Sequence, residues 1–170
     1  MTAKKILFYV FAIIALAINV VIIEESFVAG AGSSSHSQGF TKMLIDFIKF
    51  FDENSILIQD ENLFHAVVRK LFGHFLLFGG FGLFVSLTFM MKENFVGKSK
   101  YLVGIIILSI GLVNASVSEL IQYFTPGRAG ALTDILIDYS GYLLFALVIY
   151  FIFFILYIHA HKKDGLEGSK

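Results

Sequence analysis

The chain has 170 residues, of which 57% are apolar and only 15% are charged, and its mean hydropathy is +0.81. Soluble domains contain about 25% charged residues, and disordered chains combine low hydrophobicity with high net charge, so both classes are excluded. Because 13 Lys and Arg balance 13 Asp and Glu, there is no basic surplus for nucleic acid. The absence of cysteine excludes disulfides and thiolate metal sites. A small polytopic membrane protein remains.

Four apolar stretches are long enough to cross a bilayer core of ~30 Å, which takes roughly 20 helical residues. They run over about Ile6–Ile23, Leu71–Met91, Tyr101–Gln122 and Ile135–Ile158. The first resembles a signal peptide, but it is long and no small-residue cleavage site follows closely. We therefore expect an all-α polytopic membrane bundle with four transmembrane helices, forming a single domain over residues 1–170. With a cytoplasmic N-terminus, the short inside segments hold eight cations and the longer outside segments five, which predicts both termini inside.

A long outer segment, Glu24–Lys70, separates the first two spans. Its first part, Gly30–Gly39, is rich in Gly and Ser and predicts a loop. Over Lys42–Glu53, apolar residues recur at helical spacing, with charged residues opposite them: Leu44, Phe47, Ile48 and Phe51. This pattern predicts an amphipathic helix on the outer side. It would either lie flat at the membrane interface or pack on the outer ends of the bundle, and in both positions it would roof a site below.

Polar residues gather at the outer ends of the last three predicted spans. They are Arg69, Lys70 and His74, then Glu119 and Gln122, then Arg128, Asp134 and Asp138. An ionisable group at membrane depth costs several kcal/mol unless it is paired or hydrated, so each one is a functional-site hypothesis. Three pairs share a helix face because their members lie three or four positions apart: Lys70 and His74, Glu119 and Gln122, Asp134 and Asp138. Gly141, near the two aspartates, would let another helix approach closely.

Structural alternatives stand beside these site roles. Arg69 and Lys70 would also serve as interfacial anchors, and Glu119 as one half of a structural ion pair with a nearby cation. Asp134 would cap the fourth span. Asp138 lies a turn deeper, caps nothing, and favours a site role. Arg128 sits on a turn that Pro126 and its glycines stiffen, which suits a bidentate contact with phosphate or carboxylate.

Three stretches carry a family resemblance: Arg69–Phe75 (RKLFGHF), Ser118–Arg128 (SELIQYFTPGR) and Asp134–Gly141 (DILIDYSG). Their order and spacing resemble the VanZ-like family of bacterial membrane proteins from about Glu24 to the end of the fourth span, and E-x-x-Q-x-x-x-P-G-R is the most specific pattern. The resemblance implies a bacterial plasma-membrane location. It also implies characteristic roles for Arg69, Lys70, His74, Glu119, Gln122, Pro126, Gly127, Arg128, Asp134, Asp138 and Gly141.

The chain departs from the family pattern at two places. Apolar residues follow His74 where relatives often carry an acid and a tyrosine, and Ser118 stands where an acid commonly precedes the glutamate. Fewer acids weaken any mechanism that needs two carboxylates near the histidine. The family is named for a member linked to resistance to a glycopeptide antibiotic of the teicoplanin type, which acts on cell-wall precursors.

Two functions remain open on the sequence. In the first, cations hold the anionic headgroup of a membrane lipid or lipid-linked envelope precursor, and His74 and Glu119 form an acid–base pair. The binding residues would be Arg69, Lys70, Gln122, Arg128, Asp134 and Asp138. In the second, the protein is a non-catalytic binding or shielding protein whose cluster is mainly an ion-paired clasp. No nucleophile stands out, and no cofactor is expected. A metal is left open at His74, Glu119, Asp134 and Asp138, although no tight ligand motif supports it. A homodimer is left open, since four spans make a small transporter.

Overall fold

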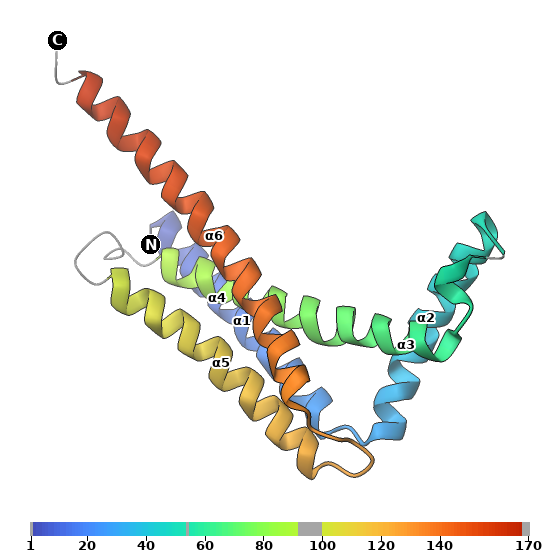
Figure 1. The fold of residues 1–170 in the computed structure, drawn as a ribbon. Coiled ribbons are helices and arrows are strands. Elements are labelled where there is room, and N and C mark those ends of the chain that lie inside the picture. Colours follow the sequence, from blue (N-terminus) through green and yellow to red (C-terminus); the bar gives the residue numbers. More distant parts are fainter. Residues whose placement is uncertain (1, 54, 92–99, 168–170) are drawn as a thin grey trace.

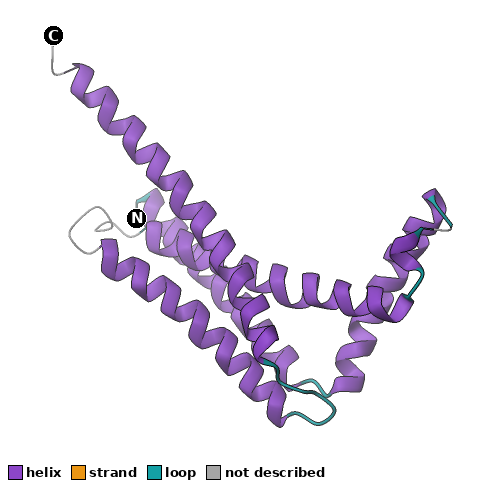
Figure 2. Cartoon of the chain, in the orientation of Figure 1, coloured by secondary structure: helices purple, strands orange, loops and turns teal. Residues whose placement is uncertain are grey.

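Helices make up nearly all of the computed structural model, which describes residues 2–53, 55–91 and 100–167. In chain order they are α1 (Ala3–Phe27), α2 (Gly30–Phe51), the 3-10 turn η1 (Ile56–Ile58), α3 (Glu61–Val68), the π-helical η2 (Arg69–Leu76), α4 (Leu77–Met90), α5 (Lys100–Phe124) and α6 (Leu132–Glu167). Within these described ranges there is no strand, and the predicted all-α class is confirmed (Figure 2).

Within the described residues, four helical stretches are long and apolar enough to cross a membrane. They cover Ala3–Phe27, Glu61–Met90, Leu102–Phe124 and Leu132–Leu156. The polytopic bundle predicted from hydropathy is therefore confirmed. The second stretch begins ten residues before the apolar run at Leu71, because α3, η2 and α4 follow one another as one long helix (Figure 1).

The bundle packs around α4, which lies against both α1 and α6, while α5 packs on α6 (Figure 1). Tyr142 of α6 is fully buried at the centre, and its hydroxyl donates to the carbonyl of Ile107 on α5 at 2.7 Å. Two glycines make room for it. A methyl group at Gly82 would lie 2.3 Å from the Tyr142 carbonyl oxygen, and one at Gly111 would lie 2.2 Å from the ring.

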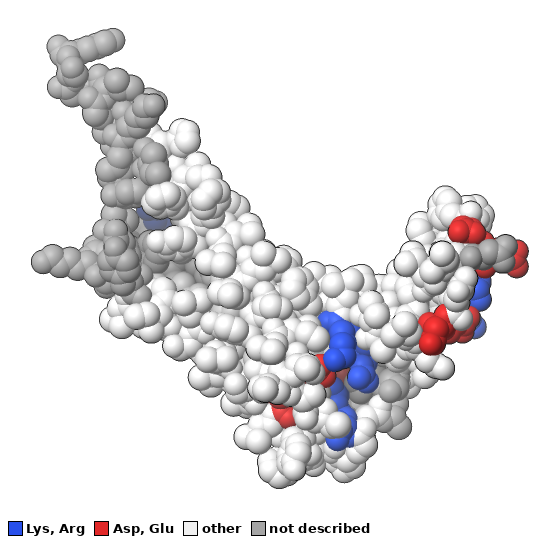
Figure 3. All heavy atoms as spheres, in the orientation of Figure 1, with Lys and Arg blue, Asp and Glu red and all other residues white. Residues whose placement is uncertain are grey.

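One end of this bundle carries the predicted polar residues, and we call it the polar end. It comprises the end of α1, segment η2, the end of α5, the turn after α5 and the start of α6. The start of α1, the end of α4 and the start of α5 lie at the opposite end (Figure 1). On the face drawn in Figure 3, charged side chains gather at the polar end and on the arm formed by α2 and α3. The rest of the bundle surface that is not grey in this view is mostly uncharged.

The segment 30–39, predicted as a loop, is the first part of helix α2, so that prediction is wrong. Its hydroxyls bond within the helix, from Ser35 to the carbonyl of Gly32 and from Thr41 to the carbonyl of Ser37. Gly30 meets the turn after α5 directly, and its amide donates to the Pro126 carbonyl at 3.1 Å. Tertiary contacts thus outweigh the poor helix propensity of Gly and Ser.

Helix α2 packs along α3 and leans away from the bundle (Figure 1). Ile45 is buried, whereas Phe47 and Phe51, on the predicted apolar face, are 63% and 71% exposed. A helix that leaves aromatic side chains uncovered in this way suits the membrane interface, which was one of the two predicted positions.

Candidate functional site

The polar end begins with an unusual helical segment. Over Arg69–Leu76 the backbone is π-helical, with the wider turn that such segments have. It presents Arg69, Lys70 and His74 toward the neighbouring helices. Segments of this kind are frequent at functional sites, because they change which side chains share a face.

Two matched contacts join η2 to α6. Lys70 donates to a carboxylate oxygen of Asp134, and one helical turn further His74 Nδ1 lies 3.0 Å from Asp138 Oδ1. His74 is 6% exposed and Asp138 is fully buried. Beyond them Gly141 allows close approach, since a methyl group there would lie 2.1 Å from the Phe75 carbonyl oxygen. The predicted role of Gly141 is confirmed.

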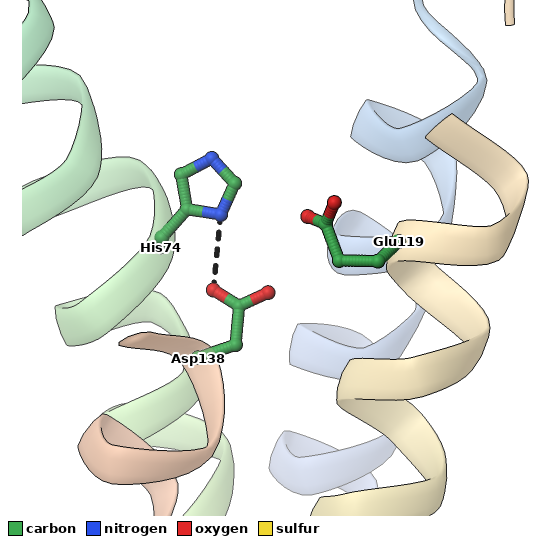
Figure 4. A group of neighbouring side chains, drawn as sticks. All are labelled: His74, Glu119 and Asp138. Atoms are coloured by element: carbon green, nitrogen blue, oxygen red, sulfur yellow. Dashed lines mark hydrogen bonds and ion pairs between the residues drawn. The ribbon is translucent and has the colours of Figure 1, made fainter. Parts of the chain in front are cut away.

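Glu119 approaches the same point from α5. Figure 4 shows its carboxylate across from the His74 ring and the Asp138 carboxylate. One oxygen, Oε2, accepts the backbone N–H of Ala131 at 3.0 Å. Ligand-type atoms of these three residues all lie within 4.8 Å of one another. Glu119 makes no ion pair with a cation among the described residues, so the structural pair considered for it is not what the structure contains.

Arg128 ties the turn after α5 to α1. Its Nη1 donates to the carbonyl oxygens of Glu25 and Val28 at 2.8 and 3.4 Å, and its Nη2 donates to Gln122 Oε1 at 2.6 Å. Gly127 has the positive φ that the sequence allowed for in this turn, at 73°. Burial lowers the pKa of the Arg128 guanidinium from its ordinary value, and the nearby Arg69 lowers it further.

A chain of hydroxyl groups continues from Gln122 into the bundle. Gln122 Nε2 donates to Ser118 Oγ at 3.3 Å, and Ser118 Oγ lies 2.8 Å from Ser26 Oγ of α1. Thr125 bonds the Ser26 carbonyl. These contacts fix the end of α1 against the end of α5, so the polar end is a defined arrangement of side chains.

A cavity of about 290 Å³ opens beside these groups. Its polar lining consists of Glu25, Ser26, Ser37, Arg69, His74, Ser118, Gln122 and Arg128, and its apolar lining includes Ile22, Phe40, Phe72, Leu77 and Phe78. The Nε of Arg69 is buried and has no hydrogen-bond partner within the described part of the chain. A charged donor is therefore left unsatisfied beside the cavity.

The comparison with known proteins agrees with the motifs at this end. The model of the VanZ/LLP1 family matches residues 7–156, most of the chain. The chain belongs to the VanZ/LLP1 family. No curated protein and no solved structure matches it significantly. Together with its four apolar helices, family membership makes it a VanZ-like multi-pass membrane protein.

In this VanZ/LLP1 protein, all eight residues that the sequence singled out lie at the polar end, but they divide into two groups. Arg69, His74, Gln122 and Arg128 line the cavity. Lys70, Glu119, Asp134 and Asp138 lie behind it, in contacts between helices or beside His74. The expected acid–base partners His74 and Glu119 are neighbours, although the described hydrogen bond of His74 goes to Asp138.

Several cavity-lining side chains of the VanZ/LLP1 protein escaped the sequence analysis, among them Glu25, Ser26, Phe40 and Phe72. One signal was available for the first two. An acid and a hydroxyl follow the first apolar run directly, so they lie at the membrane depth of the other polar residues. The two phenylalanines come from the amphipathic arm and from η2, and their ring centroids lie 5.0 Å apart. Phe40 follows the segment 30–39 directly, and because that segment was predicted as a loop and not as part of α2, the contact with Phe72 was not expected.

Proposed function

We propose that the cavity binds the phosphate or carboxylate headgroup of an anionic membrane lipid or of a lipid-linked cell-envelope precursor. The observation behind this proposal is the unsatisfied Nε of Arg69 beside the cavity. A buried polar group without a partner costs free energy, and a charged one costs more. A planar guanidinium matches the oxygens of phosphate and carboxylate, so an anionic headgroup would remove this cost.

The two arginines support the same ligand. Arg69 and Arg128 both line the cavity and lie close enough for each charge to disfavour the other. An anion between them would turn this repulsion into attraction. Glu25 also lines the cavity, and its carboxylate would oppose an anion, so anion binding depends on the two guanidinium groups outweighing it.

The apolar lining supports an amphiphile over a free anion. Phe40 and Phe72 lie on one side of the cavity and Ile22, Leu77 and Phe78 belong to the bundle. A lipid would place its headgroup at the arginines and its first carbon atoms against these rings. Free phosphate would leave the apolar surface uncovered, so a lipid-linked anion gains additional burial energy.

His74 extends the proposal toward chemistry on the bound headgroup. Its Nδ1 faces Asp138, and a carboxylate in that position orients an imidazole and fixes its tautomer. With Nδ1 protonated, Nε2 is the basic nitrogen, and His74 lines the cavity. We propose His74 as the base and Glu119 as its acid partner in any proton transfer.

The test removes the charge of Arg69 and leaves the rest of the chain intact. Native mass spectrometry of detergent-solubilised protein would count adducts of phosphatidylglycerol and of zwitterionic phosphatidylcholine. Arg69→Gln loses a charge-assisted contact worth about 2 kcal/mol, so the Kd for phosphatidylglycerol rises roughly thirtyfold. Lys49→Gln is the matched control, because Lys49 pairs with Glu61 on the arm, away from the cavity. Equal phosphatidylglycerol binding by both variants and wild type would refute the proposal.

A cellular readout uses the same pair of variants. If the bound amphiphile is a wall precursor, expression in a teicoplanin-susceptible bacterium raises the inhibitory concentration, and Arg69→Gln removes the increase while Lys49→Gln keeps it. This readout assumes a plasma-membrane location with both termini cytoplasmic, which places the cavity toward the outside, where such precursors are used.

The second candidate is the non-catalytic clasp, and particular contacts favour it. Lys70 with Asp134, and Arg128 with α1 and Gln122, connect elements that the sequence separates widely. In that case the cluster serves stability alone. Arg69→Gln would then leave lipid binding unchanged, whereas replacement of Lys70 or Arg128 would lower the unfolding free energy.

A further inference from the structure

We infer that His74, Glu119 and Asp138 form a binding site for one divalent transition-metal ion. The three residues come from three different elements, η2, α5 and α6, and converge on one point (Figure 4). Their ligand-type atoms lie within 4.8 Å of one another. They are 6%, 3% and 0% exposed, so the point lies inside the protein.

Unsatisfied oxygens provide the second observation. Each carboxylate uses one oxygen on a protein donor, Oε2 of Glu119 on the Ala131 amide and Oδ1 of Asp138 on His74. The other oxygens, Glu119 Oε1 and Asp138 Oδ2, are buried and have no hydrogen-bond partner among the described residues. Two buried acceptors beside one imidazole call for a cation that all three can share.

The distances suit shared coordination. Donor atoms ~2.1 Å from one ion lie roughly 3.0–3.4 Å apart when adjacent and about 4.2 Å apart when opposite. His74 Nδ1 and Asp138 Oδ1 lie 3.0 Å apart, so an ion would replace the proton between them. The imidazole would then carry its proton on Nε2, and in that loaded state His74 would bind the ion and would not act as a base. All separations are within 4.8 Å, so the widest of them would need to shorten by a few tenths of an ångström for all three groups to reach one ion.

Charge also favours a divalent ion. Two carboxylates and a neutral imidazole carry two negative charges, which a divalent ion cancels inside a low-dielectric bundle. The neighbouring cation Lys70 is engaged by Asp134, and Arg128 by Gln122 and the α1 carbonyls. One nitrogen and two oxygens favour Zn²⁺ or Mn²⁺ over Ca²⁺ and Mg²⁺, which prefer oxygen ligands throughout.

The inferred metal site does not depend on the proposed headgroup binding, but a bound ion would affect the chemistry of the headgroup site. Three protein ligands leave coordination positions for water or for a ligand oxygen. Because His74 also lines the cavity, the ion would lie beside the proposed headgroup site. There it could polarise a phosphoryl oxygen and lower the pKa of a bound water.

The test measures metal directly. Full-length protein without an affinity tag, in detergent, is stripped with a chelator, reloaded with Zn²⁺ or Mn²⁺, and desalted. Elemental mass spectrometry should find close to one ion per chain in wild type. Glu119→Gln and Asp138→Asn should retain no stoichiometric ion. Asp134→Asn, the same change one turn away on α6 at the residue paired with Lys70, should retain it.

A second measurement covers variants that fail to fold. Co²⁺ bound to wild type should give visible absorption bands that an equimolar amount of Zn²⁺ abolishes. If wild type binds no ion in either measurement, the inference is overturned. In that case a Glu119→Gln variant with a higher unfolding free energy than wild type would indicate that the two carboxyl groups share a proton. Arg69 is not a ligand of the proposed metal site, so a negative metal test would not affect the phosphatidylglycerol proposal. A negative phosphatidylglycerol test would likewise not affect the metal proposal.

Discussion

Arg128→Lys is the most informative single substitution, because it keeps the positive charge but replaces the planar guanidinium, with its several N–H donors, by a single ammonium group. The guanidinium makes three hydrogen bonds, to Gln122 Oε1 at 2.6 Å and to the carbonyls of Glu25 and Val28 at 2.8 and 3.4 Å. An ammonium group is a single donor point and cannot bridge both sides of the turn. The lysine variant therefore keeps at most one of these three hydrogen bonds.

The expected magnitude follows from these contacts. Hydrogen bonds to charged groups contribute about 1.5–3 kcal/mol in soluble proteins, but bonds within membrane bundles average about 0.6 kcal/mol. The Val28 contact is long and adds little. We expect Arg128→Lys to lower the unfolding free energy by about 2 kcal/mol, because one of the links between the end of α1 and the turn after α5 is weakened.

Equilibrium unfolding in mixed micelles of increasing SDS fraction measures the effect, and a double-mutant cycle with Gln122→Met isolates one contact. The short contact between Arg128 and Gln122 predicts a coupling energy of about 1 kcal/mol. A coupling energy of zero, or a lysine variant as stable as wild type, would refute the view that Arg128 joins helices through directed hydrogen bonds.

Two further predictions concern the bundle and its orientation. Gly82→Ala should lower the unfolding free energy by about 1–3 kcal/mol because its methyl group meets the Tyr142 backbone, whereas Gly104→Ala, with nothing within 4 Å, should be neutral or slightly stabilising in the same SDS titration. Equal stability of the two would contradict the close approach of α4 and α6. Because the chain lacks cysteine, Gln59→Cys should react with a membrane-impermeant maleimide in intact cells and Lys163→Cys only after lysis. The opposite pattern would invert the expected orientation.

Hydropathy was sufficient to predict the architecture, because the cost of burying polar backbone in lipid leaves few alternatives to helices of this length. It was insufficient for the segment 30–39. Local propensity predicts a loop there, but the amide of Gly30 bonds Pro126 from a distant part of the chain. Such contacts have no signature in a local window. The π-helical turn at Arg69–Leu76 likewise follows from packing against α6, which no periodicity in η2 reveals.

Spacing predicted which residues share a helix face, but not that the faces of η2 and α6 meet. Lys70 and His74 lie four positions apart, as do Asp134 and Asp138, and the structure joins them in register. The helical repeat indicates which residues share a face. It does not state which neighbouring helix comes to the same depth, and for that reason Glu119 was the expected partner of His74 where Asp138 forms the hydrogen bond.

The two arginines show that the sequence does not reveal which hydrogen-bond donors are satisfied within the protein. Arg128, on its stiff turn, has the pattern typical of an anion ligand, but its donors are largely used on carbonyls and Gln122. Arg69 reads as an interfacial anchor, yet its buried Nε has no partner in the described chain. Satisfied polar groups hold helices together, and a buried unsatisfied group calls for an explanation, for which an ion or a ligand is one. At this polar end an unpaired donor lies beside the cavity and two unpaired acceptors lie behind His74, so we expect an anion and a cation as its natural ligands.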